Sequence, residues 1–214
     1  MVDKDFSFDK IESILNGTSN FYISSKEELN KCLDHVVQLI SDSYVLYINN
    51  SYTSSSFLAI SVLEEVGKIQ MGIFIKGSDS YVRKDKLRDH KSKQIVGASY
   101  TICMGERINN AISNENLEKI FQFIYSGELK DLREKAIYCD RKNNNIVTPK
   151  DLITQELARN LLLFAIESFD DNLDHIHFTF KCKKRKFYHR GTVFSLKKIL
   201  REKYLLLQIT EEIR

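Results

Sequence analysis

The chain has 214 residues, a net charge of +3, one proline and eight glycines. This length suits one domain, or one domain with a small appendage, and is enough to bury a real core. So few turn-forming residues argue against a β fold with many turns and predict an all-α bundle of about five to seven helices. The four cysteines lie far apart in the sequence, which excludes a CxxC pair or a zinc-ligand pattern and favours reduced thiols.

Neither secretion nor membrane insertion is expected. Residues 1–5 contain no basic region followed by an apolar one, so no secretory signal is visible. The apolar run after Tyr44 is interrupted at residues 49–51 and 54–56, which makes it too polar for a span of roughly 20 apolar residues. We therefore predict a cytoplasmic protein that does not associate with membranes.

Two long helices are predicted first in the chain. Ser24 and Glu27 suggest a capping box at the start of a helix over residues 26–48, whose apolar positions recur every three or four residues. A second helix, over residues 52–75, is apolar around most of its circumference. It is therefore expected to be the central helix of the bundle.

The second helix carries an isolated group of charges. Between residues 43 and 75, the only Asp, Glu, Lys or Arg residues are Glu64, Glu65 and Lys68. Ionised side chains are rarely buried unless they are paired, so this group is either part of a functional site or a structural ion pair between Glu64 and Lys68. Gly67 in mid-helix costs about 1 kcal/mol relative to alanine, unless another backbone packs against it.

A third helix is predicted from about Tyr81 to Met104. On that helix Arg83 and His90 are seven residues apart, so they would project from one face. A histidine can take the proton of a ribose 2′-hydroxyl, and an arginine can stabilise the charge that develops on phosphate oxygens. The pair is therefore a candidate for RNA cleavage that needs no metal, although Arg and His often occur at this separation by chance.

Further helices are predicted over residues 116–125 and 128–138, followed by a polar loop at 140–145. Arg133 and Asp140 are again seven residues apart, but Asp140 lies at or beyond the helix end, and a turn at Asp140 with a core position for Tyr138 is the interpretation that the residues favour. A threonine, a proline and an acidic residue at 148–151 then open a helix that is expected to reach about Phe169.

The pattern changes after residue 170. Asp170, Asp171, Asp174, His175 and His177 have no regular metal-ligand spacing and are interpreted as a polar loop. Alternation from Ile176 to Cys182 then predicts a strand, which allows a short β-hairpin near the C-terminus. We divide the chain into a helical domain, residues 1–170, and a basic appendage, residues 171–214.

The appendage is the most basic part of the chain. Residues 181–214 hold eleven Lys/Arg against three Glu, a net of +8, which leaves residues 1–180 at −5. Clustered cations attract phosphates, so an anionic partner such as RNA is predicted, although a solvated basic face explains the charge equally well. The candidate nucleic-acid-binding residues are Lys183, Lys184, Arg185, Lys186 and Arg190.

Three segments taken together resemble the AbiV family of bacterial abortive-infection proteins, over roughly residues 25–170. They are an EExGK segment, a His followed by lysines, and an Arg with a downstream Tyr-x-Asp before a proline. The matching residues are Glu64, Glu65, Gly67 and Lys68, then His90, Lys91 and Lys93, then Arg133, Tyr138, Asp140 and Pro149.

The resemblance implies an anti-phage protein that shuts down gene expression and stays silent until a phage-encoded trigger appears. The family is similar to the HEPN group of helical, dimeric ribonucleases, whose motif is an Arg, four to six residues, then a His. Arg83 and His90 fit that motif, with Lys84 where the group commonly has Asn, Asp or His. The implied catalytic set is Arg83, His90 and a supporting carboxylate, Glu65, with no metal or cofactor.

Two other interpretations remain open. The protein could be a non-enzymatic inhibitor of translation, or of a phage process, that binds RNA or a protein partner through its basic tail. The charged residues could also form one buried ion network that holds helices in register, with Glu64, Glu65, Lys68, His90 and Arg133 as its members.

Overall fold

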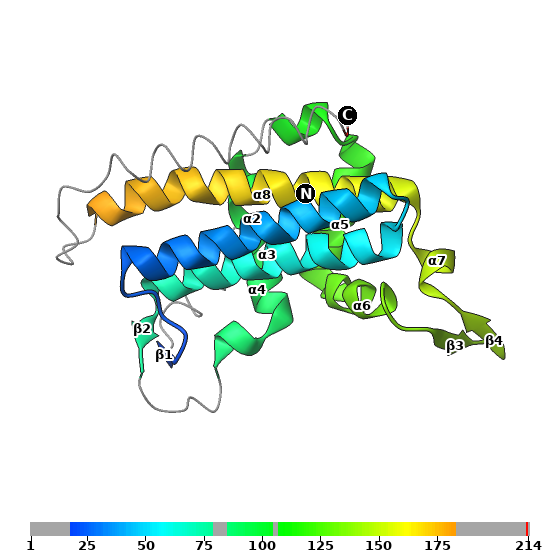
Figure 1. Ribbon diagram of the computed structural model, residues 1–214, viewed down its shortest axis with the longest axis horizontal. Helices are drawn as coiled ribbons and strands as arrows, with labels where there is room; N and C mark the ends of the chain where they lie inside the picture. Colours follow the sequence, from blue (N-terminus) through cyan, green and yellow to red (C-terminus); the bar gives the residue numbers. More distant parts are fainter. Residues whose placement is uncertain (1–17, 79–84, 105–106, 183–212, 214) are drawn as a thin grey trace.

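The computed structural model describes residues 18–78, 85–104, 107–182 and 213, and this part of the chain is an all-α bundle (Figure 1). The all-α prediction is thus confirmed. The seven described α-helices are α2 (Lys26–Ile48), α3 (Tyr52–Phe74), α4 (His90–Met104), α5 (Asn114–Ser126), α6 (Glu128–Lys135), α7 (Pro149–Leu152) and α8 (Gln155–Cys182).

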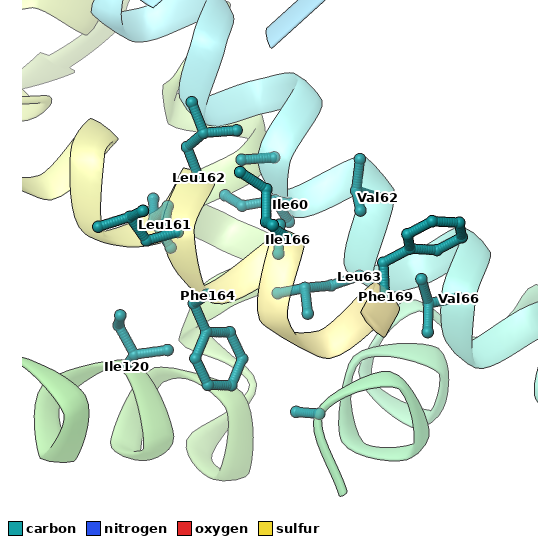
Figure 2. Packing of buried hydrophobic residues seen from close by; sticks show 14 of the residues in the cluster. Ile60, Val62, Leu63, Val66, Ile120, Leu161, Leu162, Phe164, Ile166 and Phe169 are labelled. Carbon is teal, nitrogen blue, oxygen red and sulfur yellow. The ribbon is translucent and has the colours of Figure 1, made fainter. Parts of the chain in front are cut away.

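The helix α3 is central, as its apolar circumference predicted. It packs against α2, α4 and α8, and α2, α3 and α8 run side by side (Figure 1). Figure 2 shows Leu63 of α3 facing Ile166 of α8, with Phe164 of α8 beside Ile120 of α5. Each such side chain contributes about 1.5–3 kcal/mol on burial, so this core fixes the position of α3 against its neighbours.

The helix ends follow local chemistry. The capping box of α2 uses Ser25 and Glu28, one residue later than predicted. The box that opens α7, from Thr148 to Asp151 with a proline at the first helical position, lies where it was expected. That helix ends at Leu152, however, and α8 begins anew, so one predicted helix is in fact two.

The third predicted helix is wrong over residues 85–89. Asp85 and Asp89 are not helical, residues 86–88 form a 3₁₀ turn, and α4 begins only at His90. The carboxylate of Asp85 accepts from the Leu87 amide, and that of Asp89 accepts from the Ser92 amide. Aspartates compete in this way with helical backbone bonding and favour helix starts.

This break removes the expected shared helical face. No continuous α-helix joins residue 83 to His90, and Arg83 itself lies outside the described residues. The position of Arg83 relative to His90 is therefore outside what the structure describes.

The predicted strand over residues 176–182 is also wrong, because α8 continues through Cys182. Extending an existing helix costs less than starting a strand that has no partner. The same helix passes residue 170 without a break, and the basic residues from 183 to 212 lie outside the described part.

A β-hairpin lies instead where a loop was predicted. The strands β3 (Asp140–Lys142) and β4 (Asn145–Val147) pair antiparallel. Asn143 and Asn144, with φ of 46° and 64°, form the two-residue turn, and asparagine tolerates this left-handed backbone well. Two shorter strands, β1 (Thr18–Ser19) and β2 (Lys76–Gly77), pair in parallel.

None of the helices in the described part combines the length and the apolarity that a bilayer crossing requires.

Candidate active site

The side chain of Glu64 lies at the centre of a charged cluster formed by α3, α4 and α6. Only 3% of Glu64 is exposed. Its Oε2 lies 2.7 Å from His90 Nδ1, 3.1 Å from Arg133 Nη1 and 3.5 Å from Lys93 Nζ, while Oε1 accepts from Gln94 Nε2 at 2.9 Å. We call these five residues the Glu64 cluster.

Two glycines bring α4 close enough to form this cluster. A Cβ atom at Gly67 would lie 2.0 Å from the carbonyl oxygen of Lys93, and one at Gly97 would lie 2.2 Å from that of Leu63. Side chains at both positions are therefore excluded by backbone on the facing helix. This close packing explains why a glycine occurs in the middle of α3 despite its low helix propensity. It also holds the first two turns of α4 against Glu64.

The helix α6 supplies Arg133 from a third direction. Gly127, with φ of 90°, ends α5 and opens α6 in a left-handed conformation, and Lys91 Nζ donates to the Ser126 carbonyl at 3.1 Å. The Arg133 guanidinium also lies over the Phe57 ring, 5.5 Å from its centroid. These contacts fix α6 to both α4 and α3, so the arginine approaches Glu64 in one defined orientation.

The geometry sets the tautomer of His90. An ionised carboxylate only accepts hydrogen bonds, so Nδ1 carries the proton that is donated to Glu64. In the neutral ring, Nε2 then holds the free lone pair, and it makes no hydrogen bond with any described residue. Because 31% of the side chain is exposed, this nitrogen can act as a base towards a molecule from solvent.

The cluster carries more positive than negative charge. Lys93 and Arg133 place two basic side chains beside the single carboxylate of Glu64, and Lys91 follows His90 directly on α4. The exposed fraction of the side chain falls from 23% for Arg133 to 10% for Lys93. A net positive, partly exposed site beside a histidine favours an anionic ligand such as a phosphate.

Glu65 does not take the place predicted for it. Its carboxylate pairs with Lys68 Nζ at 3.3 Å, and that ammonium lies 4.5 Å from the centroid of the Phe21 ring. The carboxylate beside His90 is that of Glu64, and the predicted Glu64–Lys68 ion pair is wrong as well. The predicted five-member ion network is therefore split into two separate groups.

One signal in the sequence could have distinguished the two glutamates. Glu64 lies three residues before Gly67 and therefore shares a helix face with it, whereas Glu65 does not. The close backbone contact at Gly67 identifies that face as the one towards α4.

The remaining predicted site residues lie elsewhere. Tyr138 is 66% exposed and is not a core residue, and Asp140 accepts from the backbone amide of Arg141 at 2.7 Å at the start of the hairpin. Neither contacts the Glu64 cluster. The tail candidates, Lys183, Lys184, Arg185, Lys186 and Arg190, lie outside the described residues. Within the described ranges, no three His, Cys, Asp or Glu side chains are grouped as a metal site.

A comparison with protein families matches residues 25–169 to the family described as AbiV, HEPN_AbiV. The chain belongs to this family. The match runs from the start of α2 to within α8 and includes every member of the Glu64 cluster, so the bundle is HEPN-like. Membership indicates a role in abortive infection, that is, in anti-phage defence. No curated protein and no solved structure matches the chain.

Proposed function

We propose that this protein is an abortive-infection ribonuclease whose active site is the Glu64 cluster, with His90 as general base. The observation that supports this most strongly is the 2.7 Å contact between His90 Nδ1 and Glu64 Oε2. A carboxylate that orients one ring nitrogen, while the other is left free, is the arrangement that makes a histidine an effective base.

In the proposed reaction, His90 Nε2 accepts the proton of a ribose 2′-hydroxyl. The 2′-oxygen then forms a bond to the adjacent phosphorus, and the bond from phosphorus to the 5′-oxygen breaks. The products are a 2′,3′-cyclic phosphate and a 5′-hydroxyl, whose proton comes from solvent or from the imidazolium. General-base catalysis of this kind contributes about 10²–10⁴-fold to the rate.

In this proposal Arg133 stabilises the phosphate charge, while Arg83, to which the sequence motif assigned that role, lies outside the described residues. Its guanidinium lies beside the histidine, with Nη1 3.5 Å from His90 Nδ1. A cation held in this position can bind the phosphate and stabilise the negative charge that develops on its oxygens. Lys93, close behind Glu64, adds to the same positive potential.

The other expectations from the family resemblance become part of this proposal. RNA is the substrate, a phage-encoded component is the trigger, the active form is a homodimer, and loss of cellular RNA accounts for the arrest of gene expression. The basic residues of the appendage would add a second, less specific contact with RNA.

The test is a cleavage assay on total RNA with purified protein, with and without extract from infected cells, and with EDTA. We expect wild-type protein to release RNA fragments that persist in EDTA, and His90→Ala to lose at least about a hundredfold in rate without a loss of folding. His35→Ala is the matched control, because His35 is an exposed histidine on α2. Full cleavage by the His90 variant would overturn the assignment.

A further inference from the structure

The β3–β4 hairpin projects from the bundle beyond α6 and α7 (Figure 1). Every residue from 137 to 146 is exposed. The projection lies apart from the Glu64 cluster, and the proposed chemistry makes no use of it. Its side chains nevertheless have a composition that points to a partner.

Large apolar side chains are unusually exposed on this hairpin and its base. Tyr138 is 66% exposed, Ile146 58% and Ile137 43%, and they make up half of the six large apolar residues exposed in the described part of the chain. The ring of Tyr138 makes no hydrogen bond, ring or cation contact with any described residue. An aromatic ring that is held out into solvent without a partner is suited to stacking.

The same segment is positively charged. Between residues 135 and 150 there are four Lys or Arg and one acidic residue, Asp140. Lys142 and Lys150 are exposed and form no ion pair with any described residue, while Oδ1 of Asp140 accepts a hydrogen bond from the Arg141 amide. Lysine is depleted in protein–protein interfaces, whereas aromatic rings among cations are typical of surfaces that bind single-stranded nucleic acid.

The hairpin is joined to the active site by a short, well-packed segment. The amides of Ala136, Ile137 and Tyr138 continue the helical bonding of α6, so Tyr138 is only about 8 Å along the helix axis from Arg133. Ala136 is buried with Ile153 in a small core that also contacts Phe57, the ring under Arg133. The base of the hairpin thus continues directly from the helix that carries the proposed catalytic arginine.

We propose that the β3–β4 hairpin is a single-stranded RNA-binding element in which Tyr138 stacks on a base and Lys142 and Lys150 contact phosphates. Delivery of RNA to the Glu64 cluster rests on the proposed ribonuclease function. The binding itself does not.

Binding is measured by fluorescence anisotropy with a labelled single-stranded RNA of about 15 nucleotides, in the His90→Ala background so that the RNA stays intact. Tyr138→Ala is expected to weaken binding about tenfold, and Tyr138→Phe, which keeps the ring, less than twofold. Lys142→Gln with Lys150→Gln is expected to reduce the slope of log Kd against log salt by about 1.4. Lys31→Gln, at an exposed position on α2, is the control and leaves binding unchanged.

The outcomes separate this proposal from the proposed function. If Tyr138→Ala binds RNA as tightly as the parent, the hairpin proposal is overturned, whether or not the protein cleaves RNA. If wild-type protein cleaves no RNA but binding depends on Tyr138, the ribonuclease function fails and the hairpin proposal stands. If the parent binds no RNA and the hairpin variants instead lose a protein partner, the hairpin proposal is again overturned.

Discussion

Glu64 and Glu65 are adjacent on α3, yet they belong to two different regions of the molecule. Glu64 faces α4 and α6, where it is buried and has four polar partners. Glu65 faces the region of Phe21 and is 25% exposed, and among the described residues it pairs only with Lys68, three residues further along the same helix. One carboxylate joins three helices, whereas the other makes a local surface pair.

The difference shows that the helix face, rather than the motif, decides what each carboxylate does. A one-residue step rotates a side chain by about 100° around the helix. Glu64 therefore faces the closely packed backbone of α4, whereas Glu65 faces partly exposed side chains. Paired variants of the two regions should therefore behave very differently.

The largest expected difference is in stability. Glu64→Ala leaves Lys93 and Arg133 without their carboxylate, and breaking a buried ion pair in this way costs about 3–5 kcal/mol of unfolding free energy. Glu65→Ala removes a partly exposed pair and should cost less than about 1 kcal/mol. Urea unfolding of the two variants measures both values. Equal losses of unfolding free energy in the two variants would contradict the difference between a buried and a surface carboxylate.

A smaller effect is expected from the glycines of α3. Gly67→Ala directs a methyl group at the Lys93 carbonyl and should destabilise the protein by about 1–3 kcal/mol, since two helix backbones must separate. Gly72→Ala meets the edge of the Phe21 ring at 2.9 Å, and that ring can rotate. Thermal unfolding should therefore show a clear loss for the first variant and a change below about 1 kcal/mol for the second, where better helix propensity offsets the contact.

The smallest effect concerns a fully exposed carboxylate, Glu28, in the capping box of α2. Hydrogen bonds from the backbone amide and the hydroxyl of Ser24 lower the pKa of Glu28 below its ordinary value of 4.5. A lowered pKa stabilises the fold above pH 4.5, and this contribution is lost as the pH falls through the folded-state pKa. Glu28→Gln should therefore lower the urea midpoint slightly at pH 7, and by less as the pH falls below 4.5. A difference in urea midpoint between wild type and this variant that increases at acidic pH would contradict the capping role.

Much of this architecture was predictable because it depends on local pattern. The bounds predicted for α2 and the start predicted for α3 are those observed, since the cap of α2 and the apolar pattern of both helices specify them. The start of α4 was missed because Asp85 and Asp89 accept hydrogen bonds from backbone amides, and helical periodicity does not reveal such bonds. The alternation of polar and apolar residues over 176–182 resembled a strand because these seven residues were considered apart from the long helix that continues into them.

The candidate site was predicted in its parts but not in its arrangement. Glu64, Lys93 and Arg133 were named as supporting residues, and His90 as the base. Which glutamate contacts the histidine, and that Arg133 lies beside it, depends on how three helices pack against one another, and a local sequence pattern does not specify that packing.

The central claim, that Glu64 and not Glu65 supports His90, is tested most directly by RNA cleavage with the two isosteric variants. Glu64→Gln keeps the shape of the side chain but removes the charge that orients the imidazole, and we expect it to lower the cleavage rate at least about tenfold. Glu65→Gln should cleave at the wild-type rate. Full activity in Glu64→Gln, or its loss in Glu65→Gln alone, would contradict this account.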